Sequence, residues 1–182
     1  MAWYAKFDGV DGSALQKDHK AWCSAASVKM SGQNVGGEGT GVGRVGGKMH
    51  LEDITMGIIT DKALPKLLEA AVKGKVFKKV EIHGTATSGN DSEQVYLGIE
   101  LENVQITSYQ LSVLDNKAAT DHLSIVLNFE KYEFVFTSWS KEDKSEGKVE
   151  HEWKSKNANS EVLSAWSSVA CILFEPRVVG AT

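Results

Sequence analysis

The chain has few of the residues that mark covalent or metal sites. It contains 2 cysteines and 2 prolines among 182 residues, and the cysteines, Cys23 and Cys171, lie far apart. This spacing fits neither a metal site nor a disulfide framework, and it favours reduced thiols in a cytosolic protein. The histidines are equally scattered, which favours solvent-facing strand positions over a zinc site. The five are His19, His50, His83, His122 and His151.

Long apolar runs and a positive charge excess are also missing. The longest apolar run, Val169–Phe174, has six residues, whereas a membrane-spanning helix needs about 20. The first residues lack the apolar core of a secretory signal, so we expect any export to follow a route that ignores the N-terminus. The net charge of −4 argues against nucleic-acid binding.

No catalytic motif stands out. The segment Gly41–Gly46 matches G-x-G-x-x-G, but a polar glycine-rich stretch precedes it and an alternating strand follows it. A dinucleotide site needs a buried strand before the motif and a helix after it, so a loop is the better interpretation. The sequence also lacks the G-x-S-x-G nucleophile motif, and its carboxylates are scattered singly. We therefore predict no catalytic residue, cofactor or metal.

Alternation of apolar and polar residues, the period of a β-strand, dominates what is present. One such segment, 20–30, places Trp22, Ala26, Val28 and Met30 on one face. Residues 141–154 mix both charges and predict a solvated hairpin. So many strands predict a mainly β protein, a sandwich or a barrel. The alternating segments are 3–7, 20–30, 48–59, 76–87, 94–114 and 121–137.

The phase of the alternation changes inside the two longest segments. In 94–114 the apolar positions are odd up to Leu101, even at Val104 and Ile106, and odd again from Tyr109. In 121–137 they change from odd to even after Phe129. A one-residue slip turns every side chain to the opposite face, so each change predicts a bulge, a bend or a break. Bent strands of this kind form the corners of a small barrel; a strand buried on both faces is the alternative.

One segment is helical instead. Apolar residues from Leu64 to Val72 recur at i, i+3, i+4, i+7 and i+8. Pro65 suits a first turn, Asp61 lies near the start, and Gly74 is placed for a C-cap. The pattern predicts one helix over about residues 64–73, flanking the β body.

Two segments do not fit this body. Residues 31–47 contain eight glycines and predict a long glycine-rich loop, a length that is usually functional or disordered. Residues 157–182 form a C-terminal extension to a domain of residues 1–156. The apolar part of the extension has strand character, and we expect it to dock as a strand or interface element. The docking residues are Val169, Ile172, Leu173 and Phe174.

The chain opens with Tyr4-Ala-Lys-Phe-Asp-Gly-Val-Asp-Gly-Ser13 and later contains Gly74-Lys-Val-Phe-Lys-Lys-Val-Glu-Ile82. Together with further segments in the same order, these residues resemble the haemolysin-coregulated proteins (Hcp) of the bacterial type VI secretion system. Two departures stand out. Leu64 replaces the usual Ser or Thr before the helix proline, and typical members end near Trp153. The other matching segments are 47–55, 60–68, 96–109 and 123–132.

The resemblance implies a small β-barrel with one flanking α-helix, six copies of which form a ring. It further implies that rings stack into a tube inside a contractile sheath, with a spike protein at the tip and effector proteins in the lumen. The subunit would stay in the cytoplasm until assembly and then leave through the apparatus, without membrane insertion. Glycine suits a loop that orders on stacking. The loop implied to stack rings contains Gly36, Gly37, Glu38, Gly41, Gly43 and Arg44.

Two other functions remain open at this point. A monomeric β-barrel that binds a small ligand would use the glycine-rich loop as a lid, and it predicts an apolar interior cavity. The tube protein of a related contractile injection particle would share the barrel and the ring.

Overall fold

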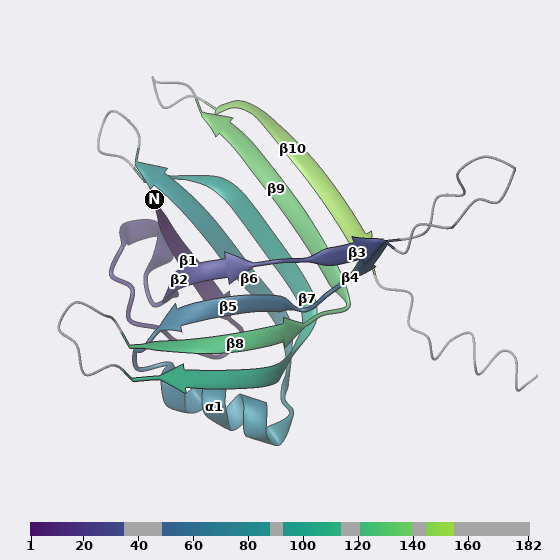
Figure 1. Cartoon of the computed structure of the whole chain (residues 1–182). Helices are drawn as coiled ribbons and strands as arrows, with labels where there is room; N and C mark the ends of the chain where they lie inside the picture. Colours follow the sequence, from purple (N-terminus) through teal and green to yellow (C-terminus); the bar gives the residue numbers. More distant parts are fainter. Residues whose placement is uncertain (35–48, 88–92, 114–120, 140–144, 155–182) are drawn as a thin grey trace, which may run out of the picture.

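The computed structural model describes residues 1–34, 49–87, 93–113, 121–139 and 145–154. Within them, one eight-stranded sheet closes on itself, and a helix packs beside it (Figure 1). A two-stranded ribbon extends from this body. The elements are β1 (Ala2–Phe7), the 3-10 helix η1 (Lys17–His19), β2 (Cys23–Lys29), β3 (Gly32–Asn34), β4 (Met49–Leu51), β5 (Ile54–Ile59), α1 (Leu64–Lys73), β6 (Val76–Thr87), β7 (Glu93–Ser112), β8 (His122–Asn128), β9 (Lys131–Trp139) and β10 (Ser145–Lys154).

The predicted barrel is confirmed, and β7 closes it. Its N-terminal half pairs with β6, and its C-terminal half pairs with β8. The circuit β7-β6-β1-β2-β5-β8 then returns to β7, with all its pairings antiparallel. Strands β9 and β10 extend the sheet from the N-terminal half of β7.

Side chains that are at most 8% exposed fill the interior of the barrel. They come from alternate positions of the strands, as period-2 patterns require. Burying each large aliphatic side chain stabilises the fold by about 1.5–3 kcal/mol. The innermost include Ala5, Phe7, Cys23, Ile54, Met56, Ile58, Val80, Ile82, Leu101, Leu123, Ile125 and Leu127.

Two of the predicted phase changes, the first in 94–114 and the one in 121–137, correspond to a single corner where β7 bends and β8 gives way to β9. Residues 97–102 of β7 pair with β9, whereas residues 105–112 pair with β8. Between them, Asn103 adopts a positive φ of 52°, and its side-chain amide donates a 2.8 Å hydrogen bond to Glu130. The backbone N–H of Glu130 donates to the carbonyl of Glu102 at 3.1 Å. The change after Phe129 is thus the break between β8 and β9, opposite the bend at Asn103.

The second phase change in β7 is a register shift. It lies between Ile106 and Ser108 in the pairing with β8. Beyond it, Tyr109 and Leu111 lie beside the buried Ile125 and Leu123. Their own side chains are nevertheless exposed.

The helix begins and ends where the sequence predicts. Asp61 accepts a 2.8 Å hydrogen bond from the backbone N–H of Ala63, and Gly74 closes the helix with a left-handed φ of 64°. The buried face differs from the prediction in detail. Leu67 and Ala70 are buried, but Val72 is 76% exposed.

The face assigned to β2 is right at Trp22, which is buried, and at Val28 and Met30, which pack against the core, but it is wrong at Ala26. Cys23 and Ala25 are buried, whereas Ala26 is exposed. The pairing of β2 with β5 shifts register between Ala25 and Ser27. A bulge of this kind changes which residues face the core, so simple alternation from Trp22 fails.

Candidate interaction surfaces

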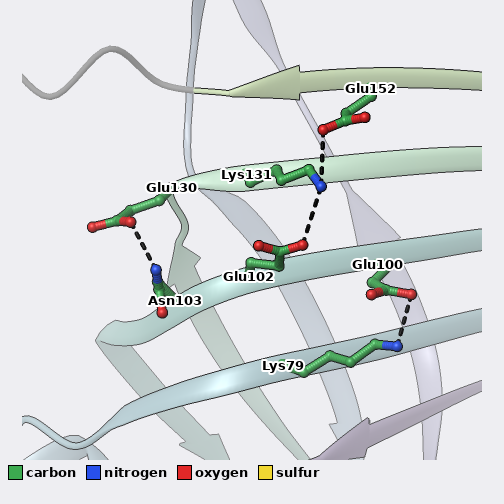
Figure 2. A network of polar contacts seen from close by, with 7 residues as sticks. All are labelled: Lys79, Glu100, Glu102, Asn103, Glu130, Lys131 and Glu152. Atoms are coloured by element: carbon green, nitrogen blue, oxygen red, sulfur yellow. Dashed lines mark hydrogen bonds and ion pairs between the residues drawn. The ribbon is translucent and has the colours of Figure 1, made fainter.

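Two lysine side chains join the strands of the extended sheet (Figure 2). Lys79 of β6 lies 2.8 Å from both Glu81 and Glu100, and the hydrogen bonds that it donates to Glu100 and Glu81 raise its pKa. Lys131 of β9 contacts Glu102 of β7 at 3.1 Å and Glu152 of β10 at 2.8 Å, and its pKa is raised in the same way. Each exposed pair contributes little to stability. Together they keep this face charged and hydrated.

The same face contains a shallow hollow of about 300 Å³ above Gly98. A Cβ on Gly98 would extend toward Val135 at an ordinary contact distance of 3.8 Å. Trp139 forms part of the wall, and its indole N–H donates a 2.8 Å hydrogen bond to the carbonyl of Val95. The lining also includes Glu81, His83, Glu100 and Glu133.

Strand β10 ends the sheet, and exposed apolar side chains lie on β10 and on its neighbour β9. Within the described residues it pairs only with β9, so its outer edge is open. Val149 of β10 is 69% exposed and lies opposite Phe136 of β9, which is 49% exposed. We call the edge of β10 with Val149 and Phe136 the β10 surface.

A second open surface lies beside the helix. Within the described chain, residues 106–112 of β7 pair only with β8. Tyr109, Leu111 and Val113 are 49%, 41% and 70% exposed, and a hollow of about 280 Å³ joins Tyr109 to Val72 of α1. We call Tyr109, Leu111, Val113 and Val72 the β7 surface.

The predicted stacking loop emerges from a short ribbon. Strands β3 and β4 pair from Gly32–Leu51 to Asn34–Met49, so the first residues assigned to the loop are a strand. Glu52 supports the base by accepting hydrogen bonds from Ser31 and, at 2.6 Å, from Gln33. The six loop residues named as stacking candidates, from Gly36 to Arg44, lie outside the described residues. So do the docking residues of the C-terminal extension, Val169, Ile172, Leu173 and Phe174.

The expectation that the histidines face solvent is wrong for His19. Its side chain is 2% exposed, and its Nε2 lies 2.9 Å from Nδ1 of His83. The ring of Tyr4 stacks on His19 with centroids 4.6 Å apart, and Trp22 meets it edge to face at 4.8 Å. No local spacing indicates this contact, because the two histidines lie on η1 and β6.

Cys23 is a free, buried thiol, and burial raises its pKa to about 12. A thiol of this kind is unreactive at neutral pH. The described residues contain no group of three or more potential metal ligands. None of the helices in this part of the chain has the length and hydropathy needed to cross a bilayer.

Taken together, these features define a small β-barrel whose most prominent surfaces are open strand edges and exposed apolar side chains, which is typical of a subunit that associates with other chains. The family model described as "Type VI secretion system effector, Hcp" matches residues 4–136. The chain therefore belongs to the Hcp family. Hcp proteins are structural tube proteins of the type VI secretion system. No curated protein matches the chain.

Solved structures share the fold. A type six secretion system protein superposes with a TM-score of 0.76 and 22% identity, over 84% of this chain and 94% of that one. A type VI secretion system effector from Yersinia pestis gives 0.67 and 20%, over 84% and 99%. Hcp1 from Salmonella typhimurium gives 0.65 and 16%, over 84% and 93%. The predicted fold class is therefore confirmed.

Proposed function

We propose that this chain is the tube subunit of a type VI secretion system. Six copies close into a ring, rings stack into a tube, and effector proteins occupy the lumen. A contractile sheath surrounds the tube, and a spike protein caps its tip. The subunit stays in the cytoplasm until assembly and is then secreted. Membership of the Hcp family and the shared barrel support this role.

The observation that carries the proposal is the presence of two different open surfaces on one barrel. The β10 surface and the β7 surface each combine an unpaired strand edge with exposed apolar residues. An unpaired edge offers backbone donors and acceptors to a strand of another chain. Contact between two unlike surfaces is heterologous, and repeated contacts of this kind form a ring when the rotation between neighbouring copies closes. We therefore assign the ring contact to the β10 surface of one copy and the β7 surface of the next.

Ring stacking is assigned to the loop that follows β3. The β3–β4 ribbon extends from the barrel and supports the base of this loop (Figure 1). Of the six residues named for stacking, only Glu38 and Arg44 are charged. Arg44 would pair with a carboxylate of the neighbouring ring.

The filled interior argues against the alternative of a monomeric small-ligand carrier. That function needs an apolar cavity inside the barrel. Here, interior side chains such as Met56, Ile82 and Ile125 have no exposed area. The hollow above Gly98 lies instead on the charged face and is lined partly by carboxylates.

The mass of the protein in solution tests the ring. Light scattering behind a sizing column should show a species near 119 kDa, six times the 19.8 kDa of the chain. Val149→Lys and Leu111→Lys should each abolish this species, because a charge would be buried in the contact. Leu15→Lys is the matched control, since Leu15 is 91% exposed and belongs to neither surface.

Mixing the two variants tests whether the contact is heterologous. Each variant keeps one intact surface, so an equimolar mixture should form a dimer of about twice the chain mass and grow no further. A mixture that remains monomeric while each variant folds normally would refute the assignment of the two surfaces. A wild-type chain that stays near 20 kDa at every concentration would refute the ring itself.

A further inference from the structure

Two histidines that come from distant parts of the chain join the segment of residues 11–22 to the sheet. His19 belongs to η1 within this segment, and His83 belongs to β6. Their facing nitrogens are 2.9 Å apart, and His19 is almost fully buried. Trp22, at the end of the segment, packs on both rings, with centroids 4.8 Å and 4.6 Å away.

The hydrogen bonds around His19 determine which ring nitrogens carry protons. The side-chain oxygen of Gln16 accepts the backbone N–H groups of Asp18 and His19, at 2.9 and 3.0 Å. The same oxygen lies 2.9 Å from Nδ1 of His19, so Nδ1 must be the donor. In the neutral ring Nε2 then carries a lone pair, and His83 must donate to it from its own Nδ1–H. Both neutral rings are therefore fixed in the Nδ1–H tautomer.

We propose that the His19–His83 pair is an acid-sensitive latch, which holds residues 11–22 against the sheet until both rings are protonated. One proton is tolerated, because a proton on Nε2 of His83 leaves its Nδ1–H donating to His19. A second proton must go to Nε2 of His19. Two N–H groups and two positive charges would then face each other across 2.9 Å, and the contact would break.

The surroundings favour the neutral pair at pH 7. Burial lowers the pKa of His19, and this effect exceeds that of the Glu93 and Asp18 carboxylates, which raise the pKa. Burial, then the charge of His19 and, to a smaller extent, that of Lys79 lower the pKa of His83, whereas the carboxylate of Glu81 raises it by less.

The remaining titratable neighbours lie on β1. Tyr4 stacks on His19 and donates a 3.4 Å hydrogen bond to Glu93, and burial and Glu93 raise its pKa, so it stays neutral. The Lys6 ammonium lies 5.7 Å from the centroid of the Trp22 ring.

The lowered pKa values set the pH range in which the latch weakens. The unfolded segment binds protons more readily than the closed pair, so the contribution of the pair is complete above about pH 6.5. It is lost progressively as the pH falls below that value.

Opening of the latch should be local. The segment has its own backbone hydrogen bonds. The N–H of Ala14 donates to the carbonyl of Trp22, and the N–H of Ala21 donates to the carbonyl of Ala14, both at 3.0 Å. Beyond the histidine cluster, the backbone N–H of Ser13 donates to Asp61 at 2.8 Å. Release therefore exposes Trp22 and the sheet face beneath it while the barrel stays closed. This device belongs to the folded subunit and does not depend on the proposed tube function.

Nitrogen-15 NMR of the imidazole rings in the full-length protein tests the geometry directly. At pH 7.5 both His19 and His83 should show the Nδ1–H tautomer, which is the less common form of free histidine. Detection of the Nε2–H tautomer at either ring under these conditions would overturn the proposal.

Hydrogen exchange tests the release. When the pH is lowered from 7.5 to 5.0, amide exchange in residues 13–22, corrected for intrinsic rates, should accelerate. We expect about a tenfold acceleration for each unit by which the closed latch lowers a histidine pKa below its value in the open segment. His83→Gln should reduce this acceleration, since glutamine can accept from a protonated His19 without adding a charge, and only the effect of burial on His19 remains. His50→Gln, at an exposed position in β4, should leave it unchanged. Acceleration that is as large in His83→Gln as in the wild type, or that is absent from the wild type, would overturn the latch.

Discussion

The corner at Asn103 allows the β7 bend to be tested by a single substitution. Asn103→Ala removes the hydrogen bond to Glu130. It also leaves a residue with no polar side-chain group at a positive φ of 52°. The left-handed conformation costs alanine about 1 kcal/mol or more, and loss of this exposed bond costs about 0.5–1 kcal/mol. We expect unfolding to become easier by about 2 kcal/mol, a fall of about 4–8 °C in Tm for a chain of this size.

Two further variants separate the contributions at this corner. Asn103→Gly loses the same hydrogen bond but accepts a positive φ, so it should be more stable than Asn103→Ala by about 1 kcal/mol. Glu130→Ala removes the hydrogen bond without changing residue 103, and it should cost about 0.5–1 kcal/mol.

Urea unfolding at one low protein concentration is the appropriate assay, because association would add to the apparent stability. The slope of the transition should be unchanged among the variants. An alanine variant as stable as the glycine variant would refute the claim that backbone conformation at residue 103 holds the bend.

Three other predictions concern the segment before β2, the glycine-rich loop and the extension. Ala21 has a φ of 64°, so Ala21→Gly should stabilise the protein by about 1 kcal/mol in the same urea assay, and a less stable variant would contradict this. Replacing Gly41 and Gly43 together by valine should leave rings intact but prevent stacking, as seen by electron microscopy; normal tubes would remove these residues from the stacking contact. Deletion of residues 157–182 should lower solubility, thermal stability or ring formation, because Val169–Phe174 is expected to dock; a truncated chain that matches the full-length one in all three would refute docking.

The sequence predicted well those features that depend on neighbouring residues. The bounds of α1 and of β6 match the predicted 64–73 and 76–87, because capping residues and the turn residues that flank a strand are local signals. The bend of β7 was also predictable, since a change of phase records a turn of the strand. These segments needed no knowledge of their partners.

Features that depend on distant residues could not be predicted in this way. The contact between His19 and His83 requires that β1 and β2 bring η1 over β6, and nothing in either local segment indicates it. Val72 follows the helical period but extends beyond the area that the barrel covers. The prediction for Ala26 of β2 was wrong because the bulge beside it has no glycine or proline to reveal it. The two open surfaces are likewise a product of strand order, which alternation does not specify.

The pairing of β5 with the much later strand β8 has a consequence for how the chain folds during synthesis. Strand β5 comes early in the chain, yet its free side is covered only when residues 122–128 pair with it. Until then Ile54, Met56 and Ile58 belong to an open apolar strand that invites pairing with other nascent chains. Because this closing contact is distant in sequence, the last step of folding should be slow compared with that of helical proteins of similar size. A cell that produces this subunit in quantity therefore benefits from protecting the chain over the interval between the emergence of β5 and that of β8.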